Sequence, residues 1–302
     1  MNEPRWTGKT PQTILLATDL SARCDRALDR AVFLADQWKA ELVILHVLED
    51  VHYGASDVLV PSWRRPADPF AKAQRRLIED VGPVAQSAHL VIEEGDAADA
   101  IRRTAEARGC DLIITGVARD EPFGRFILGG TVDRLLRIST VPVLVVKNRA
   151  LQAYRNIVVA TDFSAASRHS LEMALACFPG QKLTIFHAYD PPMKGLVNDS
   201  RAYREQVRLN LERDYKAFVD ASPAAKAIRD HARPLIEFGR PDSLLRDYCT
   251  ERHIDLVVLG TEGRSALFEI FVGSVAKEIM AELPSDALIV REREPEPAAQ
   301  TS

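Results

Sequence analysis

Short apolar runs alternate with amphipathic stretches along the whole chain. In the first half, β-branched and aliphatic runs predict buried strands over residues 14–19, 41–47, 89–92, 111–115 and 143–146. A helical spacing of apolar residues predicts helices over residues 26–39, 70–86, 98–108 and 132–138, with Ser21 as an N-cap ahead of the first. Five strands that alternate with four helices predict an α/β fold with a parallel sheet covered on both faces.

The same pattern starts again after residue 150. Residues 157–164 read Ile-Val-Val-Ala-Thr-Asp-Phe-Ser and match Ile-Leu-Leu-Ala-Thr-Asp-Leu-Ser at residues 14–21, while Gly260 matches Gly116. A tandem duplication predicts two domains, residues 1–150 and 151–302, each with a doubly wound five-stranded parallel sheet. Ligands of such sheets bind at the carboxyl ends of the strands, where Asp19 and Gly116 fall. The Glu- and Pro-rich tail over residues 291–302 is typical of disorder.

A glycine-rich stretch follows the fourth predicted strand of the second half. Gly-Thr-Glu-Gly at residues 260–263 is followed by nine residues, by Gly-Ser-Val at residues 273–275 and by a predicted helix. Glycine lets the backbone approach a ligand closely, and the first N–H groups of a helix attract anions, so the arrangement indicates a polyphosphate site. Turn glycines followed by an ordinary N-cap are the alternative interpretation.

The spacing G-x2-G-x9-G-S after an Asp-Leu-Val-Val-Leu strand resembles the nucleotide motif of the universal stress protein family, and the resemblance extends over residues 12–291. It implies two tandem domains of the universal stress protein and adenine nucleotide hydrolase type, related by a pseudo-two-fold axis. It also implies that the second domain holds ATP or a related adenine nucleotide, with or without magnesium. The residues expected at the nucleotide are Thr161, Asp162, Ala188, Gly260, Thr261, Gly263, Gly273, Ser274 and Val275, joined by Arg264, whose side chain could reach a phosphate.

The first half departs from this motif. Arg119 stands where the second half has Gly263, and two acidic residues follow it. Gly130 stands where the second half has Ser274, so a hydroxyl is lost. Each change weakens phosphate binding, which predicts that the first domain carries a degenerate nucleotide motif.

Three polar residues at strand ends leave two interpretations open. Asp162 is either an acceptor for a ribose hydroxyl or a cap for the helix that follows. His46 and His187 recur at matched strands, and a structural role is favoured over a catalytic one because no nucleophile accompanies them. No motif supplies a catalytic residue, so we assign none and keep slow ATP hydrolysis as an alternative.

Composition and charge limit the functions and the cellular compartment that we expect for the chain. The chain has 302 residues, 46% of them hydrophobic and 27% charged, with a formal net charge of −4, which disfavours a nucleic-acid or membrane surface. No apolar run approaches the roughly 20 residues of a membrane span, and the polar start does not have the apolar region of a signal peptide, so we expect a cytoplasmic protein. Its cysteines are expected to be buried thiols, at Cys24, Cys110, Cys177 and Cys249.

The resemblance implies a cytoplasmic stress-response protein with a regulatory or protective role. The run at residues 141–146 is almost wholly apolar, and in the family that the chain resembles this strand often pairs across a domain or subunit interface. The resemblance therefore implies that the halves pack on each other and, as a weaker expectation, that the chain forms a homodimer. The alternative is an interaction or scaffold protein without nucleotide. In that case the aromatic loop with Tyr53, Trp63 and Phe70 would form a partner surface, unless it covers the vacant site of the first domain.

Overall fold

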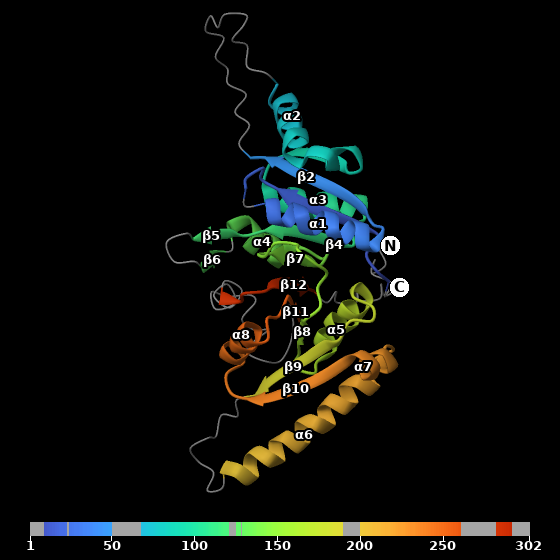
Figure 1. The fold of residues 1–302 in the computed structure, drawn as a ribbon, viewed down its shortest axis with the longest axis vertical. Coiled ribbons are helices and arrows are strands. Elements are labelled where there is room, and N and C mark those ends of the chain that lie inside the picture. The colour runs from blue at the N-terminus through green and yellow to red at the C-terminus, as the bar shows by residue number, and fades with distance from the viewer. Residues whose placement is uncertain are drawn as a thin grey trace, which may run out of the picture. The chain divides into compact units, whose positions relative to one another are not determined.

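The computed structural model describes residues 9–22, 24–49, 68–120, 125–127, 129–189, 200–260 and 282–291 (Figure 1). Tyr53 and Trp63 of the predicted aromatic loop and residues 292–302 of the predicted tail lie outside these ranges. The described chain forms two compact units, one made of residues 10–153 and the other of the residues from Tyr154 onward.

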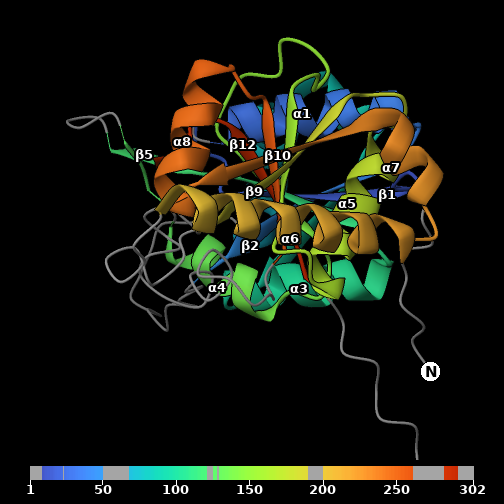
Figure 2. The same ribbon diagram turned by 90° about the horizontal axis from the view of Figure 1, so that it is seen from below.

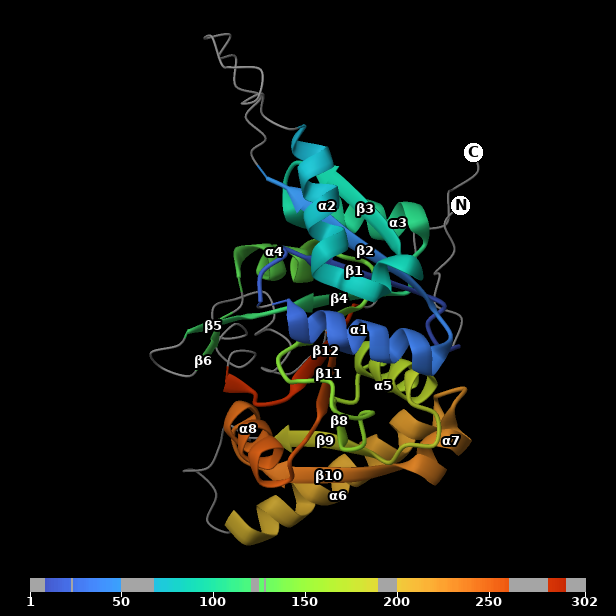
Figure 3. The same cartoon turned by 45° about the horizontal axis from the view of Figure 1, so that its top comes forward.

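The first unit contains a five-stranded parallel sheet with strand order β3-β2-β1-β4-β7. Its helices lie on both faces, with α1 and α2 on one side of the strands and α3 and α4 on the other (Figure 3). The elements are β1 (Thr13–Thr18), α1 (Asp25–Trp38), β2 (Glu41–Leu48), α2 (Pro69–Val81), β3 (His89–Glu94), α3 (Ala97–Arg108), β4 (Leu112–Gly116), α4 (Gly130–Ile138) and β7 (Val143–Val146).

The second unit repeats this order strand for strand as β10-β9-β8-β11-β12, again with parallel pairing. Figure 2 shows α5 and α6 on one side of these strands and α8 on the other. The predicted tandem doubly wound fold is confirmed. The elements are β8 (Ile157–Ala160), α5 (Ala165–Cys177), β9 (Leu183–Tyr189), α6 (Ser200–Asp220), α7 (Ala225–His231), β10 (Ala232–Phe238), α8 (Pro241–Glu251), β11 (Leu256–Gly260) and β12 (Asp286–Val290).

The central strands are apolar because both of their faces are covered. All four residues of β8 are buried, as are all five residues of β4 and of β11. Continuous β-branched runs of this kind are typical of parallel strands between two helical layers. Their carboxyl ends therefore form the part of each sheet at which polar side chains can face a ligand.

Two helix boundaries differ from the prediction. The helix expected over residues 70–86 ends at Val81 and continues as a 3-10 helix, Gly82–Gln86, because Gly82 adopts a φ of 56° and Pro83 has no N–H to donate. Ser21 does not cap α1, which starts four residues later, and the buried Ser21 hydroxyl has no hydrogen-bond partner among the residues that the structure describes. Gly82 and Pro83 indicate a helix end in the sequence, but the helical spacing of apolar residues continues past them and set the predicted boundary.

A short hairpin after β4 was not predicted. It pairs β5 (Ala118–Asp120) with β6 (Arg125–Ile127) in antiparallel fashion, and Arg119 lies opposite Phe126. Arg119 therefore has an extended backbone at the position where the second half has Gly263.

In the part of the chain that the structure describes, no helix has both the length and the hydropathy needed to cross a bilayer. Three cysteines are buried as predicted, whereas Cys24 is partly exposed.

Candidate functional site

The same four-residue turn follows the first strand of each unit. Its third residue is left-handed although it is not glycine, with φ of 57° at Leu20 and 61° at Phe163. In the second unit the Phe163 N–H donates to Thr161 Oγ1 at 2.9 Å, and the Ser164 N–H donates to Asp162 Oδ1 at 2.9 Å. The first unit has the matching bonds, from Leu20 to the Thr18 hydroxyl and from Ser21 to Asp19. The Thr-Asp-x-Ser sequence thus stabilises a strained turn in both units.

These bonds bear on Asp162, which was predicted to bind ribose or to cap the next helix. One carboxylate oxygen of Asp162 accepts a bond within the turn, and Ser164 is the residue that caps α5, by accepting from the Ser167 N–H at 3.1 Å. Asp162 therefore supports the turn, and contact with a ribose hydroxyl stays a prediction.

Thr161 is buried, and both its hydroxyl and its main-chain N–H are hydrogen-bonded within the protein. Its side chain is 1% exposed, and its Oγ1 lies 2.7 Å from the Ser167 hydroxyl. Because Ser167 donates its own proton to the Ser164 carbonyl, the Thr161 hydroxyl is the donor in this pair. The Thr161 main-chain N–H also donates, to the Phe186 carbonyl. The side chain that was predicted at the nucleotide thus has a structural role in this turn.

His187 links the turn to β9. Its Nδ1 lies 2.8 Å from the Thr161 carbonyl, and its ring stacks on Phe163 with centroids 4.5 Å apart. A carbonyl oxygen can only accept, so Nδ1 carries the proton. His46 makes the same bond to the Thr18 carbonyl, at 3.0 Å. The repetition of this bond in both units favours the structural interpretation of the two histidines over a catalytic one.

Burial lowers the pKa of His187 below its ordinary value of 6.5, although the Thr161 carbonyl and the carboxylates of Asp162 and Asp214 oppose the shift. The folded protein therefore binds a proton at His187 less readily than the unfolded chain does. The stability contributed by neutral His187 is complete above about pH 6.5 and falls as the pH drops through the folded pKa. We expect the stability difference between the wild-type protein and His187→Asn, measured by urea unfolding, to shrink from pH 7.5 to pH 5.5. An unchanged difference would contradict this assignment.

The described residues of the predicted nucleotide site lie at one edge of the second sheet. Gly260 ends β11, which pairs directly with β8, and Thr161 follows β8. β8 and β11 are neighbours in the sheet, with β9 and β10 on the outer side of β8 and β12 on the outer side of β11. Ligands of α/β sheets bind at such a switch point in the strand order. Ala188, which was predicted at the nucleotide, lies within β9, paired with Glu237 and 5% exposed. The other predicted site residues lie outside the described residues: Thr261, Gly263, Arg264, Gly273, Ser274 and Val275.

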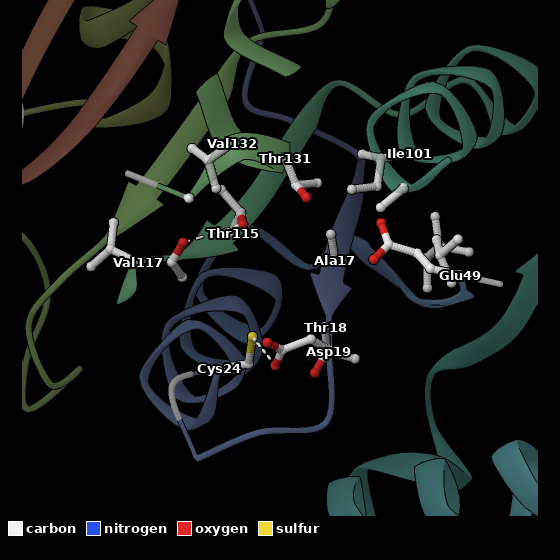
Figure 4. A pocket seen from close by; sticks show the side chains of 15 residues that line it. Ala17, Thr18, Asp19, Cys24, Glu49, Ile101, Thr115, Val117, Thr131 and Val132 are labelled. Carbon is white, nitrogen blue, oxygen red and sulfur yellow. Dashed lines mark hydrogen bonds between the residues drawn. The ribbon is translucent and has the colours of Figure 1, made fainter. Parts of the chain in front are cut away.

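A pocket of about 250 Å³ lies at the corresponding edge of the first sheet (Figure 4). The ends of β1, β2 and β4 and the first residues of α3 and α4 line it. Asp19 and Gly116, which were predicted at this edge, both belong to its lining. Glu49 and Ile101 also line it, and neither was predicted from the sequence. A comparison of all the strand ends would have found Glu49, which directly follows β2.

Cys24 is the nucleophilic group of this pocket. Its Sγ donates to Asp19 Oδ1 at 3.2 Å. Burial, together with the nearby Asp19 carboxylate, raises the pKa of the Cys24 thiol to about 11. The thiol is therefore protonated near neutral pH and is a weak nucleophile.

The glycines of the degenerate motif lie where the pocket meets α4. Gly129 precedes the helix as its N-cap without a side-chain cap, and Gly130 is the first helical residue. A Cβ added at either glycine would meet no atom of the described residues within 4 Å. The described ranges hold no group of three or more His, Cys, Asp or Glu side chains placed to bind an ion.

Comparison with known proteins identifies the family. The sequence model of the universal stress protein family matches the chain twice, over residues 11–147 and 153–291. The universal stress protein E homolog of Haemophilus influenzae is 22% identical over 312 residues, which cover 93% of this chain and 97% of that protein. A universal stress protein of Thermus aquaticus is 29% identical over 140 residues, or 46% of this chain and 99% of that protein.

A solved structure supports the fold over the whole tandem arrangement. The crystal structure of a universal stress protein from Archaeoglobus fulgidus matches with a TM-score of 0.60 at 20% identity, over 94% of this chain and 97% of that chain. Since the family model matches both halves, the chain belongs to the universal stress protein family, as a tandem member with two repeats.

Proposed function

We propose that this protein binds ATP or a related adenine nucleotide in its second domain, residues 151–302, and acts as a regulatory or protective factor in the cytoplasmic stress response. One observation carries the proposal. The motif G-x2-G-x9-G-S begins at Gly260, the last residue of β11, beside the turn that follows β8. A glycine-rich stretch that leaves a parallel strand at the switch point of the sheet suits the close approach of a polyphosphate.

The proposed site has two sides with different roles, which are the turn after β8 and the glycine-rich stretch after β11. The rigid side is the turn at residues 161–164, where the hydroxyl of Thr161 and the carboxylate of Asp162 hold the backbone in place. The other side is the stretch from Thr261 to Val275, in which Ser274 is proposed as a hydroxyl donor to a phosphate and Arg264 as a charged donor. The nucleotide is proposed as a ligand that shifts conformation or partner choice, and no residue is assigned to its hydrolysis.

Calorimetry tests the proposal directly. Nucleotide-stripped protein titrated with ATP and magnesium is expected to bind about one ATP per chain, because only the second domain has every motif position. Titrations with ADP and with ATP in EDTA establish whether the γ-phosphate and the metal contribute. If no adenine nucleotide binds, the result contradicts the proposal and favours an interaction or scaffold role. Sedimentation analysis with and without ATP tests the expected homodimer.

A further inference from the structure

Phe163 links the turn after β8 to the helix α6. It is the left-handed residue of that turn, and its ring packs against two rings of α6, with centroid distances of 5.5 Å to Phe218 and 6.0 Å to Tyr215. The same ring stacks on His187 of β9 at 4.5 Å. Aromatic rings at these separations attract each other beyond the effect of the area that they bury. A change in the position of the Phe163 ring therefore changes how α6 docks.

α6 is anchored near its carboxyl end. Phe218 is 4% exposed and Val219 is 3% exposed, and two residues after the helix the Ser222 hydroxyl donates to a carboxylate oxygen of Glu172 in α5 at 2.5 Å. Towards the amino end the helix is much less covered, since no side chain of residues 205–214 is buried among the described residues. A helix held at one end in this way opens locally at low cost, so its docking is sensitive to the few contacts that hold it.

The conformation of Phe163 depends on the residues beside it in the turn. A left-handed backbone is unfavourable for a residue with a Cβ and persists only where the surrounding contacts hold it. Here the Phe163 N–H donates to the Thr161 hydroxyl, and the next N–H, of Ser164, donates to the Asp162 carboxylate. Asp162 is also the side chain that is predicted to bond to a ribose hydroxyl. A nucleotide bound to Asp162 would fix the carboxylate that supports this turn, and so would favour one position of the Phe163 ring.

The first unit has the same link with different chemistry. Its left-handed turn residue, Leu20, is 4% exposed, and the Leu20 carbonyl accepts from Arg76 Nη2 of α2 at 3.2 Å. α2 follows β2 as α6 follows β9, so each turn contacts the helix after the second strand of its unit. The contact is made to the main chain of Leu20 but through the ring of Phe163. Leucine thus adopts the required backbone conformation at this position and supplies no ring.

We propose that α6 is the element that responds to nucleotide in the second domain, and that Phe163 is the positioning residue that couples the docking of α6 to the site. The inference rests on the nucleotide binding proposed for this domain and names the element that the nucleotide regulates. A nucleotide that fixes the turn holds the Phe163 ring against Tyr215 and Phe218, and so suppresses local opening of α6. The coupling needs no contact between α6 and the ligand, only a higher affinity of the ligand for the docked state.

Amide hydrogen exchange, followed by mass spectrometry on the full chain, tests the coupling. ATP with magnesium, at concentrations that saturate each protein by calorimetry, is expected to slow the exchange of residues 205–216 about threefold or more. Phe163→Leu introduces the residue of the first unit and is expected to abolish the slowing. Tyr215→Leu removes one of the two rings on α6, so it is expected to reduce the slowing to below about twofold without changing the affinity for ATP. Lys216→Gln, at an exposed neighbouring position, is the control and is expected to keep the full slowing.

Three outcomes would overturn the inference. If ATP binds but does not slow exchange in α6, the coupling is contradicted and the proposed function stands. If the slowing survives in both Phe163→Leu and Tyr215→Leu, the coupling is also contradicted, because a bound ligand stabilises the whole folded domain in every variant without any role for the rings. If calorimetry detects no ATP binding, the proposed function itself fails, and the coupling fails with it.

Discussion

Gly263→Arg is expected to weaken ATP binding by about tenfold to hundredfold, although it adds a positive charge next to the proposed phosphate site. A non-glycine residue held at positive φ costs about 1–3 kcal/mol, and this range converts to that loss if the binding-competent loop needs the left-handed conformation at Gly263. The first domain gives the structural precedent, because Arg119 at the matching position lies in the extended strand β5. Calorimetric titration with ATP and magnesium measures the effect.

Two controls separate the causes of that loss. Gly263→Ala adds only a Cβ, so it isolates the conformational requirement from the bulk of arginine. Arg264→Gln tests the neighbouring charge without changing the loop's glycines. If Gly263→Arg strengthened ATP binding, electrostatics would dominate and the conformational argument would be wrong.

The converse exchange restores the motif in the first domain. Arg119→Gly combined with Gly130→Ser introduces the second domain's residues, and among the described residues none lies within 4 Å of a Cβ at Gly130. We nevertheless expect the stoichiometry to stay near one ATP per chain, because the two acidic residues that follow position 119, Asp120 and Glu121, still place negative charge next to the motif. A rise to two would show that the motif residues alone distinguish the two domains, and that Asp120 and Glu121 do not exclude phosphate.

The fold was predictable because its determinants repeat along the chain. Buried parallel strands are continuous apolar runs, and the match of residues 157–164 to residues 14–21 is by itself enough to reveal the duplication. The observed strand order is the same in both units. Helix ends were less predictable, since the periodicity of residues 70–86 continues past Gly82 and Pro83, where the hydrogen bonding of the backbone changes.

The candidate sites were predictable only in part, because side-chain bonding and packing decide them. The Thr-Asp pair at each strand end indicates a ligand site from sequence, yet the structure uses Thr161 and part of Asp162 to hold a left-handed turn. The pocket of the first domain depends on how α3 and α4 meet three strand ends, which no local pattern records.

Thr161→Val is expected to lower the free energy of unfolding of the second domain by about 2 kcal/mol, as expected when buried hydrogen-bonding groups lose their partners. Valine keeps the shape of threonine but removes the acceptor for the Phe163 N–H and the donor to Ser167. The left-handed Phe163 then depends on the bond from the Ser164 N–H to Asp162 and on ring packing against His187, Tyr215 and Phe218. Urea unfolding followed by far-UV circular dichroism measures the loss.

Thr18→Val is the matched control in the first domain. Thr18 is partly exposed and accepts one bond from the turn, from the Leu20 N–H at 3.1 Å, so its loss is expected to cost about 1 kcal/mol. Trp38 is buried in α1, so its fluorescence reports on the first domain and shows which domain each substitution weakens. Equal losses at the two sites would contradict the special role of the buried Thr161–Ser167 pair.

Thr161→Val is expected to change ATP affinity by less than about threefold, because the Thr161 hydroxyl already bonds within the protein. A larger loss of affinity in folded protein would show that Thr161 contacts the nucleotide directly.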